Sequence, residues 1–369
     1  MQKDYKIIAF LLTDLYNTIS KITMNINEFN YILDKKLIAQ HPAKGRAASK
    51  MMVLYKSNSK IIHSHFYEFP DFISDNYVIV MNDSKVFPAR LYAKDQNNNQ
   101  IELLLTKEIK DGIWEVMARP MKKLKLTSIL YFGDNVHYAN IKSFDILKRP
   151  IIEFFPKNNL WDFINNYGKP PLPPYIKRKI NEYSPLDQER YQTIYAEKIG
   201  SIAAPTAGFH FTQEILDELT KKNIELIKIT LHVGPATFSP IRTASIHNHK
   251  MEPEYFEISV ESFYKIKKAK KKGKQILAIG TTSTRALESI DLNKDIDSPI
   301  KTYTDLFIYP SYHFKIVDAL LTNLHLPKST LLLLVCAFTS KQLILSAYNE
   351  AITHKYRFYS FGDCMLILP

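Results

Sequence analysis

The segment that most constrains the fold is Gln275 to Glu288, which reads QILAIGTTSTRALE. Its first half, Ile276 to Ile279, is a continuous apolar run typical of a strand that is covered on both faces. Gly280 supplies a turn, and one of the hydroxyl residues in the stretch 281–283 can cap a helix. A buried strand followed at once by a helix is the repeating unit of α/β sheets. The sequence therefore predicts a largely parallel sheet flanked by helices.

Strand-like and helix-like segments alternate through the rest of the second half. The stretch Ile224 to Val233 and the run from Leu320 to His325 are typical of strands. Val260 to Lys272 is typical of a helix, and Pro327 suits the first position of another helix that continues to Phe338. We therefore expect these segments to belong to one α/β domain.

Between Val78 and Phe155 the pattern changes to short apolar runs separated by turn sequences, such as DQNNNQ at 95–100 and KDG at 110–112. This pattern is typical of antiparallel strands joined by tight turns. At 369 residues the chain also exceeds the length at which single cores stop growing. We predict an α/β main domain with a mostly parallel sheet, formed by residues 24–77 and 157–369, and an inserted small antiparallel β-barrel domain at 78–156.

Composition excludes several classes of protein. Two cysteines, Cys336 and Cys364, cannot form a disulfide framework or a cysteine-based zinc site, which favours a reducing, cytoplasmic setting. The longest apolar run, Leu331 to Phe338, is far shorter than the ~18 residues of a membrane span, so we expect a buried helix and no membrane association. The formal net charge of +12 makes a polyanion such as nucleic acid a plausible partner. Abundant Lys, Asn, Ile and Tyr also mark an AT-rich genome, and the lysine run at 265–274 is more typical of a solvated helix face than of a phosphate-binding surface.

The run Gly200 to Thr212, GSIAAPTAGFHFT, is the strongest candidate for a ligand-binding loop. Its small residues, with Thr206 and Gly208 among them, let the backbone approach a ligand closely. His210 lies just before a helix that Thr212 can cap, a position that suits chemistry. The alternative is a buried histidine, satisfied by hydrogen bonds, in a tight turn.

Two strand-to-helix junctions are candidate anion sites. Arg285 is expected in the first turn of the helix after Gly280, where the helix dipole disfavours a cation unless an anion binds beside it. The alternative is an arginine that turns outward to a carboxylate. At the second junction Lys328 takes the equivalent place, and His325 is expected at the carboxyl end of a strand, where open α/β sheets bind ligands. The alternative for His325 is a core histidine bonded to the backbone.

Other polar residues are candidates on weaker grounds. His232 is expected on the polar face of its strand, Glu254 is a carboxylate near a histidine and suits proton transfer, and Asp83 is a charged residue at the edge of the predicted β-barrel domain. Asp363 lies in an apolar run, so it is either paired or functional. The sequence contains no HExxH motif, Walker A loop or glycine-rich dinucleotide fingerprint, which argues against an ordinary methyltransferase or dehydrogenase.

Taken together, these segments resemble one family, the S-adenosylmethionine:tRNA ribosyltransferase-isomerase of queuosine biosynthesis. The resemblance rests on blocks such as LIAQHPAKGRAASK, NDSKVFPARL, GSIAAPTAGFHFT, GTTSTRALES, LTNLHLPKSTLLLLVCAF and YRFYSFGDCMLI. It runs from about Met24 to the end, so residues 1–23 are expected to be an extension that is possibly not translated. Members usually carry Gly, His and Gly where this chain has Ala236, Glu252 and Ser311; the second difference removes a histidine from the expected site.

The resemblance implies that S-adenosylmethionine donates a ribosyl group rather than a methyl group. The acceptor is 7-aminomethyl-7-deazaguanine at the wobble position of a tRNA anticodon. Isomerisation of the transferred group gives epoxyqueuosine, and adenine and methionine leave. Such a reaction needs a base beside the sulfonium, an acid toward adenine and a neutral amine, and no metal or cofactor beyond S-adenosylmethionine.

The resemblance also implies roles for the candidate residues. His210 is expected to be the base, with Glu254 or Asp83 as the acid or as partner of the sulfonium. Substrate is expected at Thr206, Gly208, Thr281, Thr282, Ser283, Arg285, His232, His325 and Lys328. The tRNA anticodon arm is expected at Arg119, Lys122, Lys123, Arg190, Tyr191 and Tyr175, with rings stacking on splayed bases.

Two other functions remain open at this point. A non-catalytic tRNA-binding protein would explain the basic charge, and tRNA binding without adenine release would identify it. A conventional S-adenosylmethionine-dependent tRNA methyltransferase would release S-adenosylhomocysteine. In each case we expect a cytoplasmic monomer.

Overall fold

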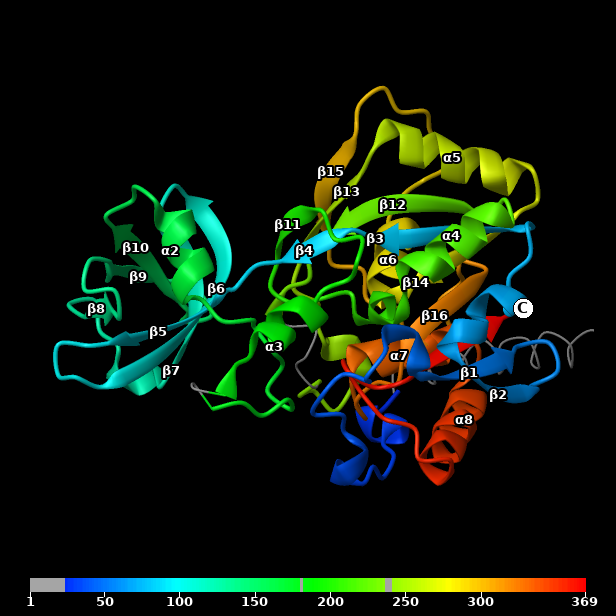
Figure 1. Cartoon of the computed structure of the whole chain (residues 1–369), viewed down its shortest axis with the longest axis horizontal. Helices are drawn as coiled ribbons and strands as arrows, with labels where there is room; N and C mark the ends of the chain where they lie inside the picture. Colours follow the sequence, from blue (N-terminus) through cyan, green and yellow to red (C-terminus); the bar gives the residue numbers. More distant parts are fainter. Residues whose placement is uncertain (1–23, 180–181, 236–240) are drawn as a thin grey trace, which may run out of the picture.

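The computed structural model of the chain describes residues 24–179, 182–235 and 241–369. Figure 1 shows two parts, a large sheet covered by helices and a smaller barrel, drawn in cyan and green, that projects to one side. The expected extension at residues 1–23 lies outside the described residues, as does Ala236. The two-part arrangement agrees with the fold class expected from the sequence.

The main sheet has nine strands in the order β15-β13-β12-β3-β14-β16-β17-β1-β2. Neighbours from β12 to β16 are parallel, as are β17 and β1, whereas the other four pairs are antiparallel. The sheet is therefore mixed, with its parallel strands at the centre. The strands are β1 (Lys50–Tyr55), β2 (Ile61–His65), β3 (Tyr77–Asn82), β12 (Glu225–Leu231), β13 (Glu254–Ile258), β14 (Gln275–Ile279), β15 (Ile300–Thr304), β16 (Ala319–Asn323) and β17 (Cys364–Leu368).

Both faces of the sheet are buried, which explains the continuous apolar runs of its central strands. Alternate side chains of β3 point to opposite faces: Val78 and Val80 join one core, Ile79 and Met81 the other. The first core includes α5 (Val260–Lys271), α6 (Gly280–Glu288), α7 (Thr330–Phe338) and α8 (Lys341–Thr353), and the second includes α4 (Gln213–Lys221) and η4 (Phe66–Phe72).

The smaller part is a closed barrel in the order β10-β7-β6-β5-β8-β9, and its strand pairs are antiparallel. Its strands are β5 (Arg90–Lys94), β6 (Gln100–Lys110), β7 (Ile113–Arg119), β8 (Ile129–Phe132), β9 (Tyr138–Phe144) and β10 (Pro150–Phe155), and α2 (Leu160–Tyr167) packs on its core. The expected boundary at 78 is wrong, because β3 lies in the main sheet and β4 (Ser84–Val86) pairs with β11 (Lys198–Ser201).

Short elements connect these parts. They are the 3-10 helices η1 (Ile26–Phe29), η2 (Lys35–Leu37), η3 (Arg46–Ala48), η5 (Met121–Lys123), η7 (Thr206–His210) and η9 (Ile246–Asn248), and the helix α3 (Pro185–Arg190). Thr212 caps α4, as expected, by accepting a hydrogen bond from the backbone N–H of Ile215.

The two strand-to-helix junctions differ from expectation. The helix α6 begins directly at Gly280 with Ile279 as its N-cap, so none of the hydroxyl residues at 281–283 caps it. Nor is Pro327 the first helical residue, because α7 begins at Thr330 with Ser329 as its cap. Since β16 ends at Asn323, His325 follows the strand and is not part of it. Each of these elements begins or ends a few residues from its expected position. The side chains that lie at the edge of the sheet therefore differ from those expected.

The helix α7 is almost wholly buried, as expected for its apolar run. Within the described ranges no single helix has both the length and the apolar character to cross a membrane. Together the helices α7 and α8 have the length and composition of a membrane span, but the two are bent by 113° relative to each other.

Candidate functional site

Two adjoining hollows lie at the carboxyl ends of β14 and β16, where the parallel part of the sheet meets α6 and η7. Each has a free volume of about 30 Å³, so each takes in one end of a ligand rather than a whole nucleoside. Four residues border both hollows: Thr206, Asn323, His325 and Leu331. The first hollow is completed by Ala204, Pro205, Ala207, Val233, Gly280, Thr281, Thr282 and Thr322, and the second by Tyr175, Leu324, Leu326, Ser329, Tyr359 and Ser360.

The N-terminus of α6 faces the first hollow. No side chain of the described residues caps this end, so its first-turn N–H groups are available to an anion. Gly280 adopts φ +89°, a conformation that favours glycine. A Cβ placed at this position would lie at ordinary contact distance from the Cβ of Ala207. Thr281 and Thr282 line the hollow, and the buried hydroxyl of Thr282 has no hydrogen-bond partner among the described residues. The hollow therefore combines free backbone donors with an unsatisfied hydroxyl.

Asn323 contributes a second unsatisfied group at the end of β16. Its side chain is 2% exposed, and its Nδ2 donates to the carbonyl of Tyr359 at 3.0 Å. Its buried Oδ1 has no hydrogen-bond partner of standard geometry within the described part of the chain, but the Asn323 side chain interacts with the imidazole of His210. Because an unpaired buried acceptor costs free energy, this carbonyl oxygen can be satisfied by the ring of His210 or by an N–H donor of a ligand.

His325 is the histidine that borders the hollows. Its Nε2 lies 2.7 Å from the hydroxyl of Thr322, and its backbone N–H donates to Tyr348. Burial lowers its pKa to about 3, so the ring is neutral and only weakly basic at physiological pH. To act as a base it would need a bound substrate that raises this pKa, because the best catalytic pKa lies near the working pH.

His210, the residue expected to be the base, lies behind this site. Its ring is 2% exposed, packs 5.3 Å from the ring of Phe66, and does not border either hollow. Burial lowers its pKa to about 4, and interaction with the Asn323 side chain offsets this only in part. The alternative of a buried histidine in a tight turn agrees better with this position, and the ring interacts with the side chain of Asn323.

Arg285 and Glu254 form a buried ion pair rather than two separate site residues. The guanidinium also donates from Nε to the carbonyl of Leu306 at 3.0 Å, and Glu254 Oε1 accepts from the N–H of Gly234 at 2.9 Å. The expectation that Arg285 lies in the first turn of α6 is wrong, because it lies in the last turn. It therefore does not point a charge at the helix N-terminus. It pairs with a carboxylate, as in the alternative, but it is buried and does not turn outward.

Asp83 and His232 lie beside β4, outside the two hollows. Thr230 donates its hydroxyl hydrogen to Asp83 at 2.6 Å, and burial raises the pKa of that carboxyl. His232 Nδ1 lies 2.7 Å from the hydroxyl of Ser84, and burial lowers its pKa to about 4. Neither residue borders the hollows, so their expected roles find no geometric support here.

Three of the expected substrate residues have structural partners instead. A Cβ at Gly208 would lie 2.1 Å from the Tyr195 hydroxyl, so that glycine admits a tyrosine rather than a ligand. Ser283 donates to the carbonyl of Ile279 at 2.8 Å. Lys328 donates to Asn27 Oδ1 at 2.7 Å at the surface. Thr206, Thr281, Thr282 and His325 are the expected substrate residues that the structure brings together.

The residues expected to bind tRNA fall into two groups. Tyr191 is 1% exposed and packs against Phe209 and Phe361, so a base cannot stack on it. Tyr175 borders the second hollow, with its hydroxyl 2.7 Å from that of Ser360, and is a wall of the site rather than a surface platform. Half-buried Arg190 donates to the carbonyl of Ala43.

Arg119, Lys122 and Lys123, in contrast, are exposed at one end of the barrel. Arg119 borders a surface groove together with Tyr92, Gln100, Glu102, Arg178, Lys179 and Glu182. This groove joins the barrel to the segment before α3, whose place beside the barrel is visible in Figure 1. The structure thus keeps the barrel cations accessible to a partner.

The lysine run on α5 is partly neutralised. Lys265 pairs with Glu261, Lys267 with Asp295 and Lys270 with Asp318. These pairs favour the solvated-face interpretation of the run.

Asn323 is the main residue that sequence reasoning missed. It is a polar residue at the end of an apolar strand, two positions before His325, and the same rule that selected His325 could have found it. Tyr359 and Ser360, from the segment before β17, could not be found in this way because only the fold brings them to β16.

Hollows at the strand ends of a sheet flanked by helices, together with a smaller barrel that carries exposed cations, define an α/β protein with a candidate ligand-binding site. The family model described as "Queuosine biosynthesis protein" matches residues 26–367, and the chain belongs to that family. It is 45% identical to the S-adenosylmethionine:tRNA ribosyltransferase-isomerase of Halothermothrix orenii, over 94% of this chain and 100% of the relative.

Two further similarities agree with this assignment. The protein of the same name from Natranaerobius thermophilus is 43% identical over 93% of this chain and 99% of its own length. The crystal structure of S-adenosylmethionine tRNA ribosyltransferase from Thermotoga maritima is 34% identical, with a TM-score of 0.52, over 92% of this chain and 100% of that one. Similarity over nearly the full length of both chains extends the family membership to the sheet and the barrel alike.

Proposed function

We propose that this protein is an S-adenosylmethionine:tRNA ribosyltransferase-isomerase. It transfers the ribosyl group of S-adenosylmethionine to 7-aminomethyl-7-deazaguanine at the wobble position of a tRNA anticodon and isomerises it to epoxyqueuosine. Adenine and methionine leave. The observation that carries the proposal is the pair of hollows with unsatisfied polar groups, in a chain whose relatives bear this name over their full length.

The hollows suit one end of S-adenosylmethionine. The methionine carboxylate would accept hydrogen bonds from the first-turn N–H groups of α6 and from the Thr282 hydroxyl. Asn323 Oδ1 would accept an N–H of the ammonium group or of adenine. No charged side chain borders the hollows within the described ranges, so recognition there depends on dipoles and hydrogen bonds. The rest of the nucleoside would lie over the opening, because the free volume is small.

Proton transfer is the main chemical demand. The sulfonium acidifies the neighbouring ribose carbon, and a neutral imidazole can take up the proton that is released. Since His325 borders the hollows and His210 lies behind Asn323, we assign the base to His325 and a positioning role to His210. The buried pair of Glu254 and Arg285 would act as scaffold rather than as the acid toward adenine.

The barrel would bind the tRNA. Exposed Arg119, Lys122 and Lys123 can contact phosphates of the anticodon arm, and the groove beside Tyr92 offers an aromatic ring at the same end. We propose that the protein acts as a cytoplasmic monomer and that the reaction takes no metal or second cofactor.

One experiment tests the function as a whole. Pure protein is incubated with S-adenosylmethionine and tRNA that carries the deazaguanine precursor, and the products are separated by mass. Free adenine together with a mass gain on the nucleoside supports the proposal. Release of S-adenosylhomocysteine would instead identify a methyltransferase, and tRNA binding without adenine release would identify a binding protein.

The ligand placement is tested by matched substitutions in α6. Thr282→Val removes the unsatisfied hydroxyl and keeps the shape of the side chain, so the KM for S-adenosylmethionine should rise roughly tenfold. Ser283→Ala, one residue later and outside the hollows, should leave that KM unchanged. Equal KM values for both variants and the wild type would contradict the proposal that the methionine carboxylate binds to the Thr282 hydroxyl at this helix terminus.

A further inference from the structure

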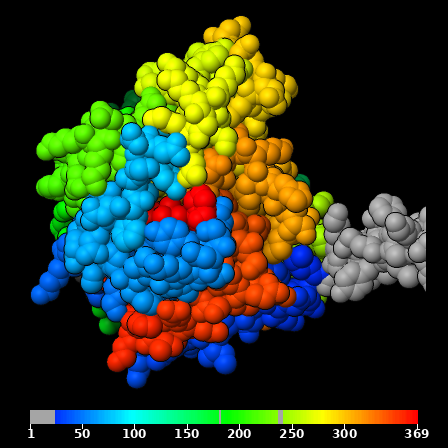
Figure 2. All heavy atoms as spheres, turned by 90° about the vertical axis from the view of Figure 1, so that its right-hand side faces the viewer, coloured from blue at the N-terminus to red at the C-terminus, as the bar shows by residue number. Residues whose placement is uncertain are grey.

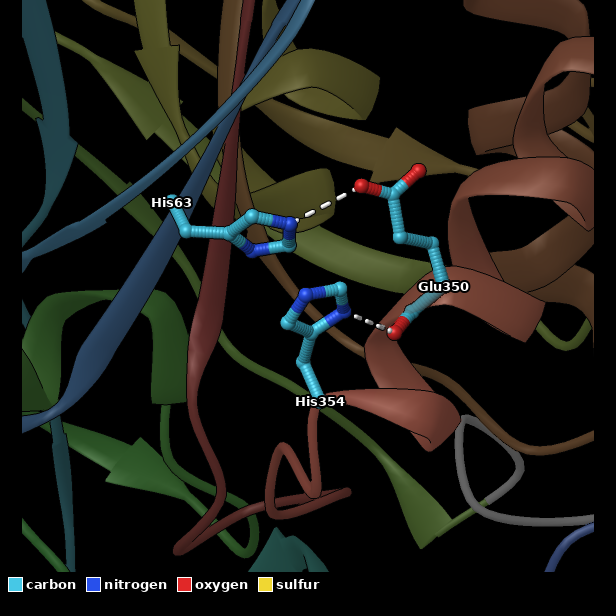
Figure 3. A group of neighbouring side chains, drawn as sticks. All are labelled: His63, Glu350 and His354. Carbon is cyan, nitrogen blue, oxygen red and sulfur yellow. Dashed lines mark hydrogen bonds and ion pairs between the residues drawn. The ribbon is translucent and has the colours of Figure 1, made fainter.

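A second cluster of ligand-type side chains lies far from the hollows, at the edge of the sheet. His63 belongs to the edge strand β2, while Glu350 and His354 are one helical turn apart at the end of α8. Figure 3 shows the three side chains pointing toward one another from the two elements. Their ligand atoms all lie within 4.8 Å of one another. Fold and helix periodicity together, rather than sequence spacing, create this cluster.

The second nitrogen of each imidazole is already held. His63 Nδ1 lies 2.9 Å from the hydroxyl of Tyr356, and His354 Nδ1 lies 3.0 Å from the backbone carbonyl of Glu350. Metal-binding histidines in proteins show this arrangement, in which a hydrogen bond at one nitrogen fixes the tautomer and frees the other for the metal. The Nε2 of His354 is the nitrogen left for a metal, whereas the Nε2 of His63 lies 2.9 Å from Glu350 Oε1 and would release its proton when a metal binds.

The distances suit a small ion. A tetrahedral zinc site has Zn–N distances of ~2.0–2.1 Å, which places its ligand atoms roughly 3.4 Å apart. His63 Nε2 is 2.9 Å from Glu350 Oε1, and the two imidazole rings are stacked with centroids 4.0 Å apart. Because His63 and His354 are exposed, small rotations of their side chains can bring the three ligand atoms to this spacing.

A simple surface ion pair explains less of this geometry. Pairing of His63 with Glu350 accounts for one contact and contributes little when exposed. It does not explain why His354 is stacked on His63 with its own Nδ1 bonded to the carbonyl of Glu350. Lys50, a cation beside the cluster, donates to the backbone carbonyl of His354 at 2.8 Å and lies over the Tyr356 ring, so it pairs with neither Glu350 nor an imidazole nitrogen in the described structure.

We propose that His63, Glu350 and His354 form a binding site for a divalent transition metal of the zinc type, with water as the fourth ligand. Two imidazoles and one carboxylate are a common ligand set for zinc. A bound ion would join the edge strand β2 to the end of α8. Figure 2 shows the β1–β2 region, in blue, beside the orange-red residues of α8 on one exposed face, so the site is open to ions from solution.

The site is tested on the full-length protein without a polyhistidine tag. After treatment with a chelator and dialysis, Zn²⁺ is titrated calorimetrically, and Co²⁺ is added separately for its absorption spectrum. We expect a single ion per chain, a tetrahedral Co²⁺ spectrum, and a melting temperature that rises by a few degrees when the ion exceeds its dissociation constant. The absence of saturable Zn²⁺ binding would overturn the proposal.

Variants identify the ligands. His63→Ala and His354→Ala should each weaken Zn²⁺ binding at least tenfold and abolish the rise in melting temperature, and Glu350→Gln should weaken binding less. His65→Ala is the matched control, because His65 is on the same strand and face but outside the cluster. Melting temperatures measured without metal report whether each variant folds. Undiminished binding by the His63 and His354 variants, or equal weakening by His65→Ala, would place the ion elsewhere.

Discussion

The hollows at the sheet and the groove at the barrel differ in charge and in exposure. No described residue that borders the hollows carries a formal charge, and most of those residues are buried. In the groove, five of the seven bordering residues are charged, namely Glu102, Arg119, Arg178, Lys179 and Glu182. Hydrogen bonds are strong and specific where water is excluded, whereas exposed charges act at longer range and are screened by salt. The two regions therefore differ in the kind of partner that we propose for each, a small donor at the hollows and a large polyanion at the groove.

The net charge of the chain does not by itself show this division. Lysines of α5 pair with carboxylates, whereas the cations Arg119 and Lys122 at the barrel remain exposed without an ion pair in the described structure. Position, not the total of +12, decides which cations can meet a phosphate.

The largest effect is expected in the hollows. His325→Ala removes the neutral imidazole that we assign as base, so adenine release should fall by roughly 10²–10⁴-fold. Adenine is measured by chromatography, and tRNA affinity, measured in parallel, should not change. His313→Ala removes an exposed histidine and is the control. Normal adenine release by His325→Ala would show that His325 is not the base.

Arg285→Ala tests whether the residues behind the hollows are scaffold. Because it leaves Glu254 buried without its cation, it should lower the free energy of unfolding by about 3–5 kcal/mol, measured with urea. The double variant Arg285→Met with Glu254→Leu should recover much of this loss. If Arg285→Ala is as stable as wild type but binds S-adenosylmethionine poorly, the arginine belongs to the site.

The buried histidines predict acid sensitivity for the sheet. The pKa of His210 is about 4 in the folded protein and 6.5 ordinarily, so the unfolded chain binds the proton first and stability is lost as the pH falls from 6.5 toward 4. Between pH 7 and 5 this histidine alone should cost about 2 kcal/mol.

The measurement is urea unfolding of wild type and His210→Gln at both pH values. The variant should lose less stability on acidification, whereas His247→Gln, at an exposed site, should behave as wild type. Equal losses for His210→Gln and wild type would mean that His210 is not buried as described.

The smallest effect is expected at the barrel. Arg119→Ala and Lys122→Ala each remove one phosphate contact, so the slope of log affinity for tRNA against log salt should become shallower by about 1 for each. The KM for S-adenosylmethionine should stay the same. Lys268→Ala removes an exposed lysine of α5 and should leave the slope unchanged. A larger change in the salt slope for Lys268→Ala than for the barrel variants would indicate that the tRNA binds at α5 rather than at the barrel.

Much of the fold was predictable because it is encoded by local patterns. Ile276 to Ile279 predicted a buried strand, and the turn sequences between 95 and 135 predicted the barrel. The boundary at 78 failed because β3 is an apolar strand like those of the barrel, and only pairing with β12 and β14 assigns it to the sheet. Helix starts at Gly280 and Thr330 failed by a few residues, since caps depend on local geometry.

The site was predictable in part. Thr206, Thr281, Thr282 and His325 come from three separate segments and do meet at the hollows. Arg285 and Glu254 were both selected, but the sequence could not show that they neutralise each other. Gly208 was selected for close approach, and the group that approaches is Tyr195.

The sequence by itself determined the alternation of buried strands and helices, the barrel, the family and the small-residue loop, because these are properties of neighbouring residues. Only the tertiary structure decided that His325 faces the hollows while His210 lies behind Asn323, and that His63 meets His354 across the sheet edge. The physical reason is that burial and pairing, which set the charge and the reach of a side chain, depend on residues far away in the chain.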